Sequence, residues 1–325
     1  DLGISTQCAV HTTFCRQRGS RIAQYCSNIA LKLNTKLFSM ENKAAAWKVS
    51  YKGTPGVPWV RETPTLVIGI SLSHGLGQDS NSVIAATVCL GSQCMQMGKQ
   101  LRIQKKSPII CDILMKHITK FATKQFVDFV GESPQRILVY RDGGDETKLL
   151  TKEVDAIRQA MFELKKQTNE YDCKINCGSG CIHCTPAITY VVAQSNHGIK
   201  MVPEENYGGR NKNVPSGTCL VSRELIQSGT SHTDSSVCLN VDRDHDGCPH
   251  FFLNAQHGQK GTSKSVYYRC LVNENYLHRP EETGNDTKLT CETLRTLTFV
   301  MSHLYGTATK AIRHVPVIQY SKRLA

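Results

Sequence analysis

The chain has 325 residues, 40% hydrophobic and 20% charged, a balance that indicates a globular protein with a sizeable core and excludes a disordered chain. Its 39 Lys and Arg against 27 Asp and Glu give a net charge of +12, which favours a polyanionic partner, nucleic acid before membrane. No apolar run approaches the roughly 20 residues of a membrane-spanning helix, so we expect no membrane partner. Because the chain starts at Asp1 rather than at a methionine, we expect a piece of a longer protein.

The spacing of apolar residues predicts an alternation of helices and strands. Stretches with apolar residues three or four positions apart alternate with short continuous apolar runs, which are typical of buried strands. In chain order we predict a helix over 21–33, a proline-containing linker over 42–64, strands over 65–70 and 83–90, a helix over 108–130, a short strand at 137–139, a helix over 151–167, strands over 188–194, 251–253 and 267–272, and a helix over 289–304. This alternation is typical of an α/β fold in which helices flank a mixed central sheet.

Asp142 stands where the short strand at 137–139 gives way to the pair Gly143-Gly144. The carboxyl ends of strands in open α/β sheets are where ligands and catalytic groups collect. A carboxylate at this place is a candidate ligand for a divalent cation, which prefers oxygen. The alternative is that Asp142 caps the turn, as the aspartate of an Asp-Gly pair commonly does.

Fifteen cysteines without a secretory signal indicate the reduced thiols of an intracellular protein. Four of them have the spacing C-x3-C-x3-C-x2-C and lie at Cys173, Cys177, Cys181 and Cys184. Four thiolates this close together could hold one structural zinc ion in tetrahedral geometry. The alternatives are a surface loop of a cysteine-rich protein and a redox-active pair.

A series of short motifs runs through nearly the whole chain in a fixed order. They are TQC at 6–8, IALKLNTKL at 29–37, IGISLSH at 68–74, YRDG at 140–143, NVPSGT at 213–218, FFL at 251–253, GQKGTS at 258–263, HLY at 303–305 and YSKRLA at 320–325. In this order and spacing the chain resembles the Piwi domain of the Argonaute family, preceded by the end of its Mid domain.

The resemblance implies a ribonuclease-H-like fold that binds a small guide RNA and pairs it with a target RNA. Residues 1–54 would be the C-terminal part of the Mid domain with a linker, and residues 55–325 the Piwi domain. The implied partners are guide RNA, target RNA and silencing effector proteins, and the implied location is the cytoplasm or the nucleus. A plainer alternative is a basic protein that binds nucleic acid without a guide.

The 5′ phosphate of the guide is held in this family by a glutamine and two lysines, which fall on Gln7, Lys32 and Lys36. Lysines four positions apart lie on one side of a helix, where two ammonium groups and an amide can surround a phosphate. Lys310 is a further cationic candidate. Without the resemblance, the two lysines would be taken as ordinary solvated side chains.

The loop that follows the strand at 251–253 is rich in glycine, amides and lysine, a composition suited to close approach to a sugar–phosphate backbone. The resemblance places it along the channel for guide and target, although its composition alone is typical of a solvated loop. The channel residues implied are Gln259, Lys260, Thr262, Ser263 and Lys264.

Argonautes that cut their target use two metal ions held by four residues, and the resemblance places these positions on Ser71, Ile110, Asp142 and Lys322. Asp142 is the one acid among the four. A serine hydroxyl cannot replace a carboxylate that bridges two divalent ions, and Lys322 would repel such ions or form a salt bridge with Asp142. We therefore expect neither Mg²⁺ nor Mn²⁺ here and no cleavage. This pattern resembles the divergent, non-cutting Argonautes, including their worm-specific branch.

The alternative is a metal-dependent, guide-directed endoribonuclease with a rearranged acidic site. Its ligands would be Asp79, Asp112 or Asp145 beside Asp142. A two-metal site tolerates little displacement of its ligands, which weighs against this alternative.

Overall fold

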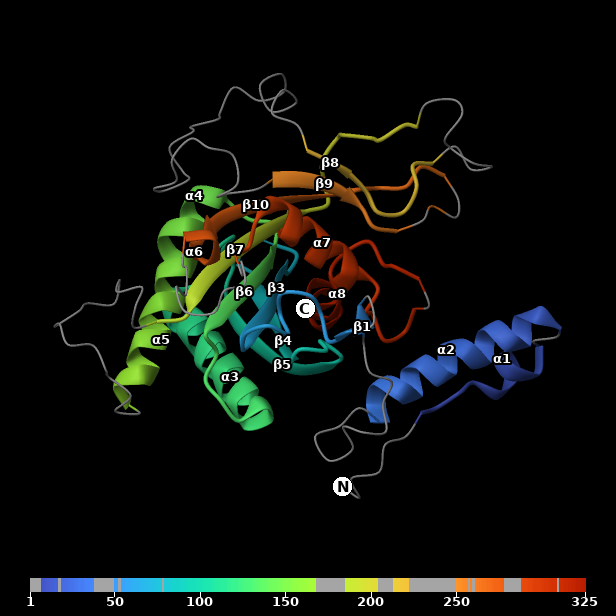
Figure 1. Ribbon diagram of the computed structural model, residues 1–325, viewed down its shortest axis with the longest axis horizontal. Coiled ribbons are helices and arrows are strands. Elements are labelled where there is room, and N and C mark those ends of the chain that lie inside the picture. The colour runs from blue at the N-terminus through green and yellow to red at the C-terminus, as the bar shows by residue number, and fades with distance from the viewer. Residues whose placement is uncertain are drawn as a thin grey trace.

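The computed structural model describes residues 7–16, 19–37, 50–51, 54–77, 79–167, 185–203, 213–221, 250–256, 258, 261–277, 288–308 and 310–325. Within these ranges the main feature is an eight-stranded sheet with the order β5-β4-β3-β6-β7-β10-β9-β8 (Figure 1). The strands are β3 (Thr65–His74), β4 (Asn81–Leu90), β5 (Gln96–Lys105), β6 (Arg136–Asp142), β7 (Ala187–Gln194), β8 (Thr218–Leu220), β9 (His250–Asn254) and β10 (Val266–Asn273). Strand β6 runs parallel to both β3 and β7, and the other neighbours are antiparallel, so the predicted mixed sheet is confirmed.

Helices cover both faces of this sheet (Figure 1). The helices of the described ranges are α1 (His11–Arg16), α2 (Ser20–Leu37), α3 (Asp112–Val130), α4 (Glu146–Lys148), α5 (Asp155–Gln167), α6 (Glu274–Leu277), α7 (Cys291–Ser302) and α8 (Pro316–Leu324), with a π-helical turn, η1 (Leu149–Val154), between α4 and α5. Helices α3 and α5 pack on one face, and α7 and α8 pack on the other. In the described parts of the chain, no helix is long and apolar enough to span a bilayer.

Each central strand contributes to two cores, because successive side chains of a strand point to opposite faces. Ile68 of β3 lies in a first core with Phe126 of α3. Its neighbour Val67 lies in a second core with Leu297 of α7 and Val317 of α8. Burial on both faces explains why β3 and β6 appear in the sequence as continuous apolar runs rather than as alternating ones.

Local signals set the ends of the main helices. Helix α3 ends at Gly131, whose φ of 90° is left-handed and whose N–H donates to the carbonyl of Val127 at 2.8 Å. Helix α7 begins after Thr290, whose hydroxyl accepts the N–H of Thr293 at 3.1 Å. Both helices lie within the ranges predicted from the sequence.

The prediction of a linker over residues 42–64 is wrong for the C-terminal end of that range. Strands β1 (Ser50–Tyr51) and β2 (Thr54–Pro55) pair with each other, and Val57 and Trp59 are buried in the second core. The guanidinium of Arg136 lies 4.7 Å from the centroid of the Trp59 ring. Frequent prolines and glycines break the apolar periodicity of this stretch, so its buried residues have no pattern to reveal them.

Gly69 lets α8 lie directly on β3. A Cβ atom at this position would come within 2.3 Å of the carbonyl carbon of Val317, so only glycine fits without displacement. On the neighbouring strand, the hydroxyl of Thr87 donates to the carbonyl of Val317 at 2.5 Å. Helix α8 is thereby fixed across β3 and β4, which brings its C-terminal half to the end of β6.

Candidate nucleic-acid site

The carboxylate of Asp142 is engaged by side chains from two other elements. The Ser71 hydroxyl, on β3, donates to one carboxylate oxygen at 3.1 Å. The Lys322 ammonium, on α8, lies 2.8 Å from the other oxygen. The salt bridge expected between Lys322 and Asp142 is therefore confirmed, and the Asp142 carboxylate contacts β3 and α8 instead of capping its turn. Three of the four positions of the expected site thus converge.

His314 lies behind this pair, just before α8. Its Nε2 atom is 3.1 Å from the Ser195 hydroxyl and 3.5 Å from the Lys322 ammonium. Burial, followed by the positive charges of Lys322 and Arg313, lowers the pKa of His314 to about 4. The imidazole is therefore neutral at physiological pH. Neither His314 nor Ser195 belongs to a sequence motif, so no pattern predicts their place at this site.

Acidification should destabilise the domain through His314. Its folded pKa lies below the ordinary value of 6.5, so the unfolded chain binds more protons as the pH falls from 6.5 towards 4. We expect the free energy of unfolding to fall by about 2 kcal/mol between about pH 7 and pH 5. Urea unfolding at several pH values over this range measures the change of the unfolding free energy with pH. We expect the His314→Asn variant to show a smaller change, and the control variant His303→Asn, at an exposed position, to show the same change as the unmodified protein. Equal changes in the two variants would contradict the role given to His314.

Ile110, the remaining position of the expected site, supplies no ligand. Its side chain is fully buried in the first core, and its N–H donates to the Glu153 carboxylate at 3.0 Å. Glu153 is itself fully buried, with the guanidinium of Arg141 at 3.3 Å and the hydroxyl of Tyr190 donating at 2.6 Å. This carboxylate therefore holds the end of β6, beside Asp142. The partners of Glu153 come from three separate segments, so no sequence pattern predicts its role.

The acids of the alternative, rearranged site do not assemble around Asp142. Asp79 and Asp112 are exposed. Asp145 caps α4, where the backbone and side chain of Lys148 lower its pKa. Within the ranges that the structure describes, no three His, Cys, Asp or Glu side chains are grouped so that they could hold a metal ion. The four cysteines proposed to bind zinc lie outside those ranges, so the zinc site stays a prediction.

The residues expected at the guide's 5′ phosphate are only partly described. Lys32 is half-buried on α2, and residue 36 follows one turn later on the same helix. The Gln7 amide donates to the carbonyl of Cys8 at 2.7 Å, and Lys310 is exposed. Helices α1 and α2 contact each other through Phe14 and Tyr25, whose ring centroids are 6.1 Å apart. The pocket itself stays a prediction.

Two of the sequence motifs meet at the expected RNA channel. The Asn213 amide donates to the carbonyl of Gly261 at 2.8 Å and accepts the N–H of Ser263 at 2.7 Å. Asn213 thus holds the loop before β10 in place, with Thr262 and Lys264 exposed. The other two expected channel residues, Gln259 and Lys260, lie outside the described ranges.

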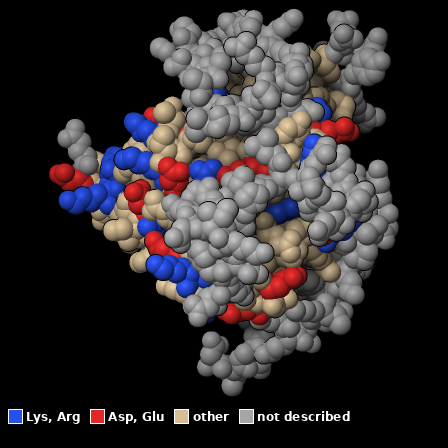
Figure 2. All heavy atoms as spheres, turned by 60° about the vertical axis from the view of Figure 1, so that its left-hand side comes forward, with Lys and Arg blue, Asp and Glu red and all other residues tan. Residues whose placement is uncertain are grey.

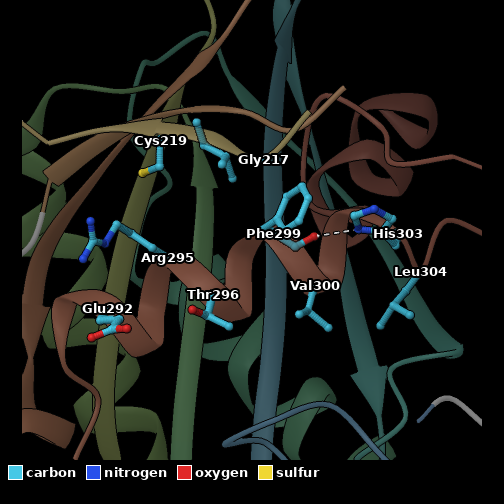
Figure 3. A pocket seen from close by; sticks show the side chains of 10 residues that line it. Gly217, Cys219, Glu292, Arg295, Thr296, Phe299, Val300, His303 and Leu304 are labelled. Atoms are coloured by element: carbon cyan, nitrogen blue, oxygen red, sulfur yellow. Dashed lines mark hydrogen bonds between the residues drawn. The ribbon is translucent and has the colours of Figure 1, made fainter. Parts of the chain in front are cut away.

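A separate cavity of about 660 Å³ lies between one face of α7 and strands β8 and β9 (Figure 3). It is lined mostly by apolar groups, including Phe299, and shares no residue with the surroundings of Asp142. Figure 3 also shows the His303 ring bonded to the carbonyl of Phe299, at 3.0 Å. None of the four positions of the expected site lines this cavity, so the polar cluster at Asp142 is kept as the candidate site.

The face that carries α5 mixes basic and acidic side chains (Figure 2). Lys116 and Lys120 of α3 lie 2.9 and 2.7 Å from the Glu163 carboxylate, and Arg158 pairs with Glu274. These pairs leave no continuous basic surface on the described part of this face. The excess of positive charge is therefore not concentrated there.

Comparison with known proteins identifies the family of this chain. The profile of the Piwi domain family matches residues 1–325. The chain belongs to the Piwi domain family. Protein argonaute 12 of Oryza sativa subsp. japonica is 27% identical over 342 residues, which are 99% of this chain and 27% of that protein. Protein tag-76 of Caenorhabditis elegans is 24% identical over 337 residues, 99% of this chain and 26% of that protein.

Solved structures agree on the fold of this Piwi domain. The C-terminal lobe of a budding yeast Argonaute aligns with a TM-score of 0.64 and 18% identity, covering 93% of this chain and 52% of that one. Kluyveromyces polysporus Argonaute with a guide RNA aligns with a TM-score of 0.61 and 19% identity, covering 93% of this chain and 30% of that one. The ribonuclease-H-like α/β fold is thereby confirmed. The chain spans about a quarter of the length of the curated relatives.

Proposed function

We propose that this Piwi domain is part of an Argonaute that binds a small guide RNA, pairs it with a target RNA and silences the target without cutting it. One observation supports the second half of this proposal, that the target is not cut. The Lys322 ammonium lies 2.8 Å from the Asp142 carboxylate, and the Ser71 hydroxyl engages the other oxygen. An ammonium at this distance supplies the positive charge that a divalent ion would bring to the same carboxylate, and it repels such an ion.

The proposal for guide binding rests on the family. Gln7, Lys32, Lys36 and Lys310 would hold the 5′ phosphate, and the loop at 258–264 would follow the RNA backbone. A relative with a solved structure contains a guide RNA. Target sequence would then be read by base pairing while the protein contacts the backbone, so affinity should depend strongly on salt.

A domain that holds a target without cutting it can still silence that target by recruiting other proteins. We therefore infer that silencing effector proteins bind the paired complex. The missing acids at Ser71 and Ile110 support a place among the non-cutting Argonautes. A relative from Caenorhabditis elegans is in keeping with their worm-specific branch.

The test uses the full-length protein, loaded with a synthetic guide and given a matched, end-labelled target in Mg²⁺ or Mn²⁺. We expect a guide-dependent complex in a gel-shift assay and no cleavage product on a denaturing gel. A mismatched target is the control for guided pairing. A product that disappears in Asp142→Ala would establish the alternative, an endoribonuclease with a rearranged acidic site. Binding that ignores the guide sequence would instead indicate a non-guided nucleic-acid protein.

A further inference from the structure

Strand β5 is the last strand at one end of the sheet, and one of its edges has no neighbouring strand in the described part of the chain (Figure 1). Its other edge pairs with β4 from Gln96 to Lys105. An unpaired edge presents a row of backbone N–H and C=O groups that can pair with a further strand. Strand β5 therefore offers a backbone template ten residues long.

One face of β5 adds exposed apolar side chains to this template. Gly98 faces α3, since a Cβ atom there would lie 3.6 Å from the side chain of Gln125. Because side chains alternate along a strand, the opposite face of β5 carries Lys99, Leu101, Ile103 and Lys105. Leu101 is 47% exposed and Ile103 is 64% exposed, so α8, which crosses β3 and β4, leaves much of this face open.

The charges along β5 are all of one sign. Residues 96–106 contain no Asp or Glu, and their basic residues are Lys99, Arg102, Lys105 and Lys106. Among the described residues, no ion pair includes any of these four. Two copies of this strand side by side would set equal charges against each other, so the basic residues oppose self-association. The same residues attract a strand whose charged residues are acidic.

A cavity of about 630 Å³ continues this surface at the C-terminal end of β5. Its lining combines aliphatic side chains with lysines and includes Lys105, Lys106, Ile109, Ile113 and Lys152. Ile113, in the first turn of α3, is 68% exposed. Among the described residues, Asp112 is the one acid in the lining, so the charge around the cavity stays positive.

Hydrogen bonds hold the loop around this cavity in place. The Gln104 amide donates to the carbonyl of Ile109 at 2.6 Å and accepts the N–H of Cys111 at 3.1 Å. The Lys106 ammonium donates to the carbonyl of Gly77 at 2.7 Å. The cavity therefore exists before a ligand binds, and a ligand has little ordering cost to overcome there.

The composition of this surface favours a peptide over RNA. RNA bases outside a duplex are commonly held by stacking on aromatic side chains, and no such side chain lines the described cavity or occurs in residues 96–106. A sugar–phosphate backbone also offers little apolar surface to Leu101 and Ile103. An extended peptide matches all the features, because its backbone pairs with the edge of β5, its apolar side chains cover these two residues and its carboxylates face the basic ones.

We propose that β5 and the cavity at its end form a docking surface for an extended segment of another protein. On the segment, two apolar residues are separated and flanked by acidic ones, so that acids face Lys99, Arg102 and Lys105. A further apolar side chain at the end of the segment enters the cavity. This inference goes beyond the proposed function, because the surface needs neither guide nor target RNA. Ser71, Asp142 and Lys322 do not line it.

A labelled peptide, Glu-Thr-Ile-Glu-Ile-Thr-Glu, is the probe for this surface. Its pattern is the same in both directions, so it fits β5 whether it binds parallel or antiparallel. RNA-free, full-length protein is titrated with the probe and followed by fluorescence anisotropy. We expect saturable binding, weakened about tenfold when alternate amides of the probe are N-methylated, because the backbone donors are then lost. Leucine added at both ends should strengthen binding about fivefold, and Ile113→Asp should remove this gain.

Charge reversal connects the probe to β5. Lys105→Glu should weaken binding of the probe about three- to tenfold, and should strengthen binding of a peptide with lysine in place of each glutamate. Lys166→Glu, at the exposed end of α5, is the matched control and should change neither. Ile103→Asp should weaken binding of the probe through the lost apolar contact. Guide-dependent binding of target RNA should stay the same in all three variants.

Several results would overturn the inference. Equal binding of the probe and its N-methylated form would show that no strand is added to β5. Equal effects of Lys105→Glu and Lys166→Glu would show general charge attraction only. Weaker target RNA binding in Lys105→Glu, with probe binding intact, would assign the surface to RNA. A dimer in analytical ultracentrifugation that Ile103→Asp dissociates would assign it to a second copy. Absence of guide-dependent RNA binding would overturn the proposed function alone, since the probe is measured without RNA.

Discussion

Replacing Gly69 by alanine should lower the free energy of unfolding by more than about 3 kcal/mol. The new Cβ would lie 2.3 Å from the carbonyl carbon of Val317 and 2.4 Å from its oxygen, far inside normal contact distance. The two nearest atoms belong to the backbone of Val317, and a Cβ is fixed by its own backbone, so no side-chain rotation can relieve the contact. Relief requires α8 to move away from β3, which would also break the bond from Thr87 and separate Lys322 from Asp142.

Gly98→Ala is the matched control, because Gly98 also lies in a strand of the same sheet. A Cβ at this position would find its nearest atoms at an ordinary 3.6 Å. We expect its effect to stay within about 1 kcal/mol, and alanine can even stabilise a strand relative to glycine. Urea unfolding followed by circular dichroism measures both variants. Similar stabilities for the two would show that α8 does not depend on close contact at Gly69.

Glu153→Ala should cost about 3–5 kcal/mol, because it leaves the buried guanidinium of Arg141 without its anion. The carboxylate also accepts the Tyr190 hydroxyl and the N–H of Ile110, so three donors lose their acceptor at once. Glu153→Gln should fall between wild type and alanine, since it keeps one acceptor oxygen but loses the charge. Thermal and urea unfolding of the purified domain measure these losses.

Glu163→Ala, on the exposed side of α5, is the control for charge removal. Its side chain is 39% exposed and pairs with Lys116 and Lys120, which lower its pKa. Exposed ion pairs contribute about 0–1 kcal/mol, so we expect a small change. If Glu153 and Glu163 proved equally dispensable, the buried network would not be what holds the end of β6.

Continuous apolar runs predicted the central strands well. Strands β3 and β6 are buried on both faces, and this burial leaves a direct trace in the composition of each segment. Strand β5 leaves no such trace, because it lies at the edge of the sheet and alternates Lys99 and Leu101 on an exposed face. Helix α8 is short, and its position depends on Gly69 far away in the chain, so no local pattern reveals it.

The same contrast holds for the candidate site. Positions aligned with the family predicted that Lys322 would pair with Asp142, and the structure confirms this pair. The roles of Glu153 and His314 depend on contacts between segments more than 30 residues apart, such as Glu153 with Tyr190 and His314 with Ser195. A lone histidine or glutamate carries no signal of such partners. The resemblance therefore located the centre of the site but not the residues that surround it.

Because Ile110 is buried, no single substitution would assemble at Asp142 the acidic site expected of a cutting Argonaute. Placing an aspartate at position 71 alone would set two carboxylates against one ammonium, with no metal ligand at position 110. A glutamate at position 110 would have to leave the first core, where the present side chain is fully buried, and would leave a cavity behind. Neither substitution alone would complete a metal site, and the change at position 110 would also weaken the fold. A designed metal site at this centre would therefore need compensating changes in the first core together with the new acids.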